Sequence, residues 1–187
     1  MGVMRLSAQT GGTVYDAKTL RSECLKGERK YAIYLPADYL ISERSYPVLY
    51  LLHPAGPRGT MPNQQGWINY GQLKQYLDAA IEKGEVAPMI VVTPDAYSEA
   101  VLTKWYADFD IYALFKQLPE EKKNEVAWFI ACGDDDALSV NNMKLHIDLK
   151  GRGINHEFRI GDGKHDWTYW RSILPEMLRF VSAQFVK

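Results

Sequence analysis

The chain has few cysteines and no strong excess of charge of either sign. Its 187 residues include two cysteines, and 22 Lys and Arg stand against 23 Asp and Glu, a formal net charge of −1. Two cysteines do not form the disulfide framework of a small secreted domain. A nearly neutral chain without a long basic run gives no electrostatic basis for binding nucleic acid or an anionic membrane. We therefore expect neither as a partner.

Long apolar runs are also missing. No stretch approaches the ~20 apolar residues that a membrane helix needs. The first ten residues, MGVMRLSAQT, lack the apolar core of a signal peptide. Two locations therefore stay open, the cytoplasm or secretion with a leader removed. Because 47% of the residues are hydrophobic and 24% are charged, we expect a globular protein, with one domain over residues 1–187.

Segments with strand patterns alternate with segments of helical spacing. Alternating residues near the start predict strands in an antiparallel meander. The continuously apolar run Val48–Leu52 predicts a strand buried on both faces. Gly84 lies where the end of a helix is expected, and Pro175 predicts a kink or a restart in the last helix. The pattern is typical of a three-layer α/β/α fold with a mostly parallel sheet. Three further strands are predicted in 87–96, 126–136 and 156–167, and helices in 71–85, 138–153 and 168–185.

Three predicted strands end in side chains that can carry chemistry. His53 follows one strand, the acids Asp134 to Asp136 follow another, and His165 follows the last in the motif GDGKHDW. In open α/β sheets, functional groups gather at the carboxyl ends of the strands. An acid followed by a histidine fits the last two members of a nucleophile–acid–histidine triad. In such a triad the acid fixes the tautomer of the histidine, and the histidine takes a proton from the nucleophile.

Other interpretations of these residues stay open at this point. Acids before a helix often cap it, and DDDALSV runs into a predicted helix. We expect no metal, because consecutive side chains on an extended strand point to opposite faces and do not converge on one ion. No cofactor is expected either. The aromatic row Trp167, Tyr169 and Trp170 is either simple packing or a stacking wall for a sugar or aryl group.

Over nearly its whole length the chain resembles the putative esterase family of the α/β-hydrolase superfamily. The segments ERKYAIYLPADY, YPVLYLLH with the later GW, and APMIVVTPDA are similar to the family's early strands. The stretch from WFIACGDDD to GDGKHDW is similar to its acid-and-histidine half. The family includes feruloyl and acetyl xylan esterases, S-formylglutathione hydrolases and mycolyl transferases. The resemblance implies a serine carboxylesterase-family protein whose partner is a small-molecule or polysaccharide ester, with acetyl or feruloyl esters of plant polysaccharide expected.

The resemblance also implies roles for particular residues. The family usually has glycine after the histidine that ends the oxyanion strand, where this chain has Pro54. Proline has no backbone N–H, so an oxyanion donor must come from the residues beyond it. The implied site residues are Asp136 as triad acid, His165 as triad base, Ala55 and Gly56 in the oxyanion loop, and Trp67 and Trp167 beside the substrate.

The family's nucleophile is missing from this sequence. It is the serine of a G-x-S-x-G turn between a strand and a helix. None of the eight serines here has glycine both two residues before and two residues after it, and Ser98, the serine nearest the expected place, lies in AYSEA. About two βα units, each of ~30 residues, are absent around this point. We therefore predict a shortened sheet and a chain that does not hydrolyse esters as it stands.

Three accounts of the chain stay open. It is a shortened esterase, a non-catalytic carbohydrate- or acyl-binding or structural protein on the same fold, or the product of a gene that lost an internal segment. The sequence leaves undecided whether the chain is an enzyme and whether it forms a homo-oligomer.

Two geometric predictions follow from the shortened sheet. The strands PVLYLLH and VAWFIAC should pair directly and in parallel, because both are too apolar to stand as free edges. Asp136 and His165 should end neighbouring strands, which lie ~4.8 Å apart. A carboxylate oxygen of Asp136 should then contact Nδ1 of His165, leaving Nε2 facing a cleft beside the HPAGP loop and Trp167.

Overall fold

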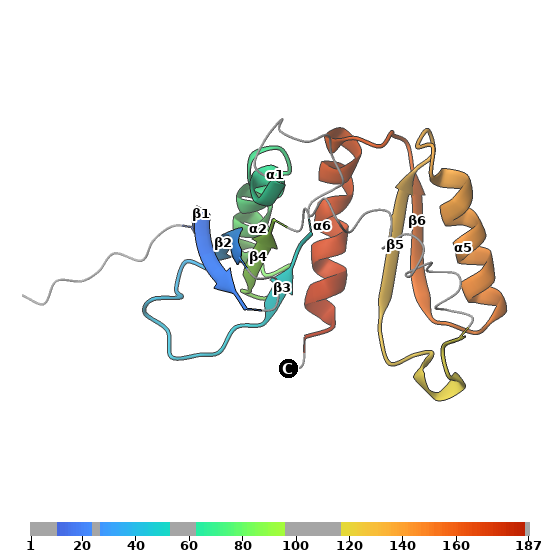
Figure 1. The fold of residues 1–187 in the computed structure, drawn as a ribbon, viewed down its shortest axis with the longest axis horizontal. Helices are drawn as coiled ribbons and strands as arrows, with labels where there is room; N and C mark the ends of the chain where they lie inside the picture. Colours follow the sequence, from blue (N-terminus) through green and yellow to red (C-terminus); the bar gives the residue numbers. More distant parts are fainter. Residues whose placement is uncertain (1–10, 24–26, 53–62, 96–116, 186–187) are drawn as a thin grey trace, which may run out of the picture. The chain divides into compact units, whose positions relative to one another are not determined.

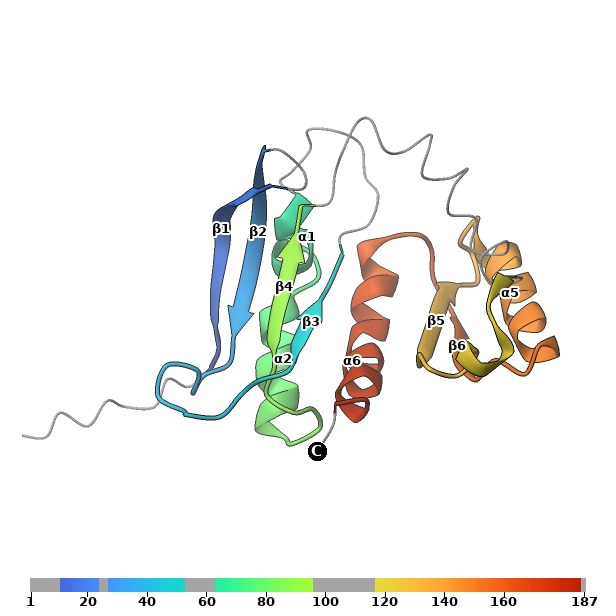
Figure 2. The same cartoon turned by 60° about the horizontal axis from the view of Figure 1, so that its bottom comes forward.

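The computed structural model describes residues 11–23, 27–52, 63–95 and 117–185. The chain divides into two compact units, Met1–Tyr97 and Ser98–Val186, which are described in turn. Figures 1 and 2 show the elements of both units in two views. None of the helices in these described residues is long and apolar enough to cross a membrane.

The first unit contains a four-stranded mixed sheet in the order β1-β2-β4-β3. The predicted opening meander is confirmed, because β1 and β2 pair antiparallel and β2 is also antiparallel to β4. β3 runs parallel to β4. The bounds of the strands are Thr13–Ser22 for β1, Gly27–Leu35 for β2, Val48–Tyr50 for β3 and Ile90–Pro94 for β4.

One longer helix packs in this unit beside the sheet. After the short elements η1 (Asn63–Gln65) and α1 (Gly66–Asn69), α2 covers Leu73–Glu82 and buries its apolar side. Asp78 of α2 accepts a hydrogen bond of 2.8 Å from the hydroxyl of Tyr34 on β2, which fixes the helix to the strand. The helix ends where the sequence predicts, because Gly84 follows it with φ of +70°, a conformation that favours glycine. The buried residues of α2 are Leu73, Leu77 and Ala80.

The prediction that β3 is buried on both faces is wrong. Val48 and Tyr50 are 45% and 69% exposed, whereas Leu51, next along the chain, is buried. In the described residues β3 is hydrogen-bonded to β4 and to no other strand. An apolar run predicts that a strand is buried, but it does not predict how much of the strand its own unit buries.

The second unit has a parallel pair of strands with a helix on each face. β5 (Trp128–Gly133) and β6 (His156–Gly161) pair in register, and η2 (Glu120–Lys122) precedes them. Figure 1 shows α5 (Ser139–Gly151) and α6 (Trp167–Ala183) on opposite sides of these strands. α6 runs uninterrupted through Pro175, so the predicted restart there does not occur.

Alternate residues of β5 point to the two faces of this strand pair, one toward α5 and the other toward α6. Trp128 and Ile130 pack against the buried cluster beneath α5, and the intervening Phe129 has its ring centroid 5.2 Å from that of Phe180 on α6. The period of two is that of a pleated strand. The expected α/β class is therefore confirmed, with helix, sheet and helix as layers of this unit. The cluster beneath α5 consists of Leu145, Leu149 and Ile154.

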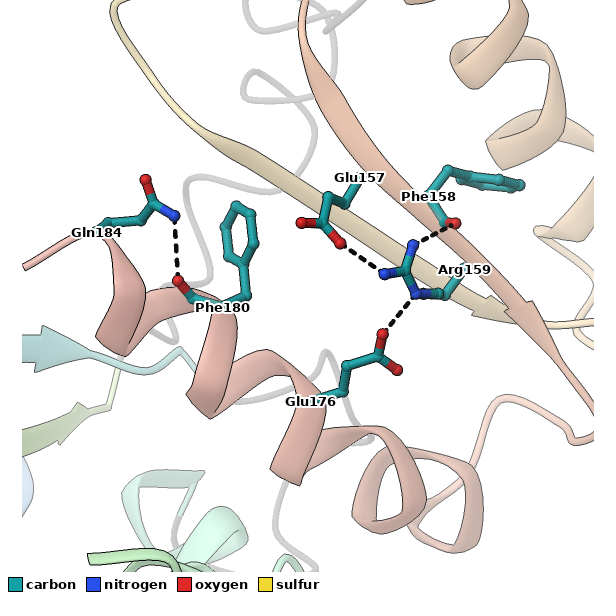
Figure 3. A network of polar contacts seen from close by, with 6 residues as sticks. All are labelled: Glu157, Phe158, Arg159, Glu176, Phe180 and Gln184. Atoms are coloured by element: carbon teal, nitrogen blue, oxygen red, sulfur yellow. Dashed lines mark hydrogen bonds and ion pairs between the residues drawn. The ribbon is translucent and has the colours of Figure 1, made fainter. Parts of the chain in front are cut away.

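Charged side chains also link β6 to α6, as drawn in Figure 3. Arg159 of β6 donates from Nε to Glu176 of α6 at 2.5 Å, and from Nη2 to Glu157 at 2.6 Å. All three side chains are partly exposed, so each ion pair adds little to stability. Of the two, the pair with Glu176 joins β6 to α6, and the pair with Glu157 lies within β6.

The predicted direct pairing of the third and fifth strands is wrong. Among the described residues, β3 is hydrogen-bonded only to β4, and β5 only to β6, in two separate sheets. The prediction rested on the apolar character of both strands, which does not specify a partner: β3 pairs with β4, and β5 pairs with β6.

Candidate active site

The site is built where β5 and β6 end. The two strands stop at the same level, because Gly133 pairs with Gly161 in the last position of the register. The segments that follow bring Asp136 and His165 together, with Oδ2 of Asp136 2.8 Å from Nδ1 of His165. The predicted contact between these two side chains is confirmed. Their catalytic roles remain predictions.

Asp136 is 6% exposed and uses both carboxylate oxygens. Oδ1 accepts from the backbone N–H of Leu138 at 2.8 Å, while Oδ2 faces His165. Burial alone would raise the pKa of Asp136, but the hydrogen bonds from Leu138, His165 and the Cys132 thiol outweigh it and lower the pKa below its ordinary value. Asp136 therefore remains a charged acceptor at neutral pH. It also shapes the turn before α5, so the two interpretations of this acid are compatible.

This carboxylate determines which nitrogen of His165 carries the proton. An ionised carboxylate can only accept hydrogen bonds, so Nδ1 must be the donor and Nε2 keeps its lone pair when the ring is neutral. The His165 side chain is 51% exposed, and Nε2 forms no hydrogen bond with any described residue. The predicted cleft beside the HPAGP loop lies outside the described residues.

Two tryptophans of α6 form a wall next to His165. The Trp170 ring meets the imidazole edge to face at 5.1 Å between centroids, and Trp167 meets Trp170 in the same manner, also at 5.1 Å. The wall is positioned by the start of α6, where the Asp166 side chain accepts from the N–H groups of Thr168 and Tyr169. The helix therefore begins at Trp167, two residues after His165.

The remaining predicted site residues are elsewhere. Trp67 belongs to the first unit, where its indole N–H donates to the carbonyl of Leu52 at 2.8 Å, just past the end of β3. Its role beside a substrate stays a prediction. The oxyanion-loop residues Ala55 and Gly56 lie outside the described residues, as do His53 and Ser98.

One contact of the site was not predicted. Cys132 is buried, and its thiol donates to Asp136. Burial and the nearby carboxylate raise the pKa of this thiol, which keeps it protonated as a donor. Its place four residues before Asp136, at the end of an apolar strand, was the available signal. Within the described residues, no three His, Cys, Asp or Glu side chains gather to hold a metal ion.

Comparison with known proteins gives the family. Residues 22–132 match the family model described as Putative esterase. Because this match spans more than half of the chain, the protein belongs to that esterase family. An acetyl esterase from Caldicellulosiruptor saccharolyticus is 34% identical over 76 residues, which cover 41% of this chain and 29% of that protein. The match thus spans less than a third of the length of this relative.

Solved structures share the fold. A ferulic acid esterase with 26% identity has a TM-score of 0.76 and covers 94% of this chain and 100% of its own. The ferulic acid esterase of Anaeromyces mucronatus, with 15% identity, has a TM-score of 0.68 and covers 96% and 92%. The S-formylglutathione hydrolase of Staphylococcus aureus, with 14% identity, has a TM-score of 0.66 and covers 92% and 98%. The fold is accordingly that of α/β-hydrolase-like esterases.

Proposed function

We propose that this chain is a serine carboxylesterase-family protein that retains the acid and base of its active site but does not turn over esters. The supporting observation is the 2.8 Å contact between Asp136 Oδ2 and His165 Nδ1, together with the exposed ring that this contact orients. The missing G-x-S-x-G turn supports the second half of the proposal.

The geometry suits general base catalysis. With Nδ1–H directed at Asp136, the lone pair on Nε2 can take a proton from a hydroxyl nucleophile, and the buried carboxylate stabilises the imidazolium that results. A triad without its serine retains only the residual rate that binding and oxyanion contacts provide. Asp136 and His165 alone therefore cannot form the acyl-enzyme that ester hydrolysis by this route requires.

An acetyl or feruloyl ester of plant polysaccharide is the substrate class that we propose for the intact site. The Trp170 ring beside His165, with Trp167 behind it, is a surface on which a sugar or an aryl group can stack. The names of the related acetyl and ferulic acid esterases point the same way.

Hydrolysis assays on the purified chain test this proposal. Wild type and His165→Ala should hydrolyse p-nitrophenyl acetate and methyl ferulate at the same slow rate, and a fluorophosphonate probe should label neither protein. The proposal would be wrong if the probe labelled one serine and turnover fell on substitution of His165. Loss of that labelling in Ser98→Ala would then identify Ser98 as the nucleophile.

A non-catalytic binding protein is the second candidate, favoured by the same tryptophan wall. Saturable quenching of tryptophan fluorescence by ferulate in the wild type, lost in Trp170→Ala while hydrolysis stays absent from both, would support it. Without saturable binding, this candidate is excluded.

A further inference from the structure

A second acid, Asp134, ties the turn before His165 to the end of β5. Its Oδ1 accepts from the backbone N–H of Gly163 at 3.0 Å. Its own backbone N–H donates to the carbonyl of Gly161 at 2.8 Å. One residue therefore holds both ends of the turn Gly161–Gly163, and His165 follows that turn by two residues.

Close packing leaves this turn little room on either side. A Cβ added to Gly133 of β5 would lie 2.3 Å from the carbonyl oxygen of Gly163, so the two backbones are closer than any side chain permits. On the α6 side, a Cβ on Gly163 would lie 2.9 Å from the ring of Tyr169, and its φ of +149° favours glycine. Contact therefore limits movement of the turn toward β5 and toward α6, and the hydrogen bonds restrain it in the other directions.

We propose that Asp134 is a positioning residue that holds His165 against Asp136. Without its carboxylate, the N–H of Gly163 loses its acceptor, and the turn is then joined to the segment after β5 only by the backbone bonds of Asp134 to Gly161 and of Asp135 to Gly163. Because only Lys164 stands between Gly163 and His165, movement of the turn moves the imidazole away from Asp136 Oδ2. The inference rests on the proposed function only in taking Asp136 and His165 as the acid and base of the site.

The neighbouring Asp135 provides a matched control. It has the same charge and is likewise exposed. It contributes its backbone N–H to the turn, donating to the carbonyl of Gly163 and to Asp134 Oδ1, each at 3.0 Å. Its carboxylate makes no hydrogen bond with any described residue. Replacing Asp135 by alanine removes an equal charge and keeps every bond to the turn.

The imidazole proton of His165 reports directly on the proposed effect. In the full chain labelled with ¹⁵N-histidine, the proton on Nδ1 is held by a carboxylate and should give a downfield resonance, assigned by its absence from His165→Ala.

We expect Asp134→Ala to lose this resonance to exchange with water. Asp134→Asn, which keeps the Oδ1 acceptor, and Asp135→Ala should both retain it. Asp134→Ser, whose hydroxyl is one bond too short to reach Gly163, should lose it and provides a second test if the alanine variant is unfolded.

Persistence of the resonance in a folded Asp134→Ala or Asp134→Ser protein would overturn the proposal. Loss of the resonance in Asp135→Ala would overturn it too, because charge rather than the bond to Gly163 would then be responsible. The measurement follows a hydrogen bond and not turnover, so it is unaffected if the chain proves to be an active esterase or to bind no ester.

Discussion

At the scale of residues, one carboxylate shapes the site. Asp136 is the buried acid of the three in CGDDD, and its two oxygens hold the turn before α5 and the imidazole of His165. The sequence could indicate this pair, because parallel strands end at the same edge of a sheet. It could not indicate the bond from Asp134 to Gly163, which depends on the path of the turn and not on the spacing of residues.

The lowered pKa of Asp136 makes part of the protein's stability depend on pH. A carboxyl group with a folded pKa below its unfolded value of about 3.9 stabilises the protein above that value, and this contribution is lost as the pH falls through the folded pKa. Asp136→Asn removes it. We expect the variant to lose about 1–3 kcal/mol of unfolding free energy at pH 7.

Urea unfolding of both proteins from pH 7 down to pH 3 checks this expectation. The difference between wild type and Asp136→Asn should be largest near neutrality and should shrink below about pH 4. A difference that stayed constant over the whole range would show that the carboxylate charge contributes nothing to stability.

At the scale of elements, α5 shows what a helix contributes to its unit. Its inner face places Leu149, which is fully buried, in the cluster beneath the helix, while Ile147 on the outer face is 65% exposed. The sequence predicted a helix over 138–153, and the structure has it over Ser139–Gly151. Apolar residues on both faces hid which side would be buried.

Truncations on the two faces of α5 should therefore differ in cost. We expect Leu149→Ala to lower the free energy of unfolding by about 2–5 kcal/mol, because it leaves a cavity among packed side chains. Ile147→Ala, an equally large truncation on the exposed face, should change it by about 0.5 kcal/mol or less. Chemical denaturation of both variants gives the comparison, and equal losses would contradict the assignment of the faces.

At the scale of the whole molecule, sequence patterns predicted the strands and helices but not all strand pairings. β3 and β5 were expected to be neighbours because each is apolar. An apolar run indicates that a strand is covered by other residues, but it does not specify which strand is the partner. The Asp136–His165 contact was predictable because β5 and β6 are joined by a single helix crossover, a connection with a well-defined geometry.

That crossover has a consequence for the order of folding. The Asp136–His165 contact joins residues 29 apart, whereas the bond from Thr93 to Ala32, between β4 and β2, joins residues 61 apart. Each doubling of loop length costs about 0.6 kcal/mol in closure entropy, roughly a threefold slower encounter.

In pulse-labelling hydrogen exchange during refolding, the amide of Asp134, bonded to Gly161, should be protected before that of Asp95, bonded to Lys30. The opposite order would refute this. If the predicted order holds, Asp136 and His165 come together before β2 and β4 have paired. The acid–base pair of the site would then form before the sheet of the first unit is complete.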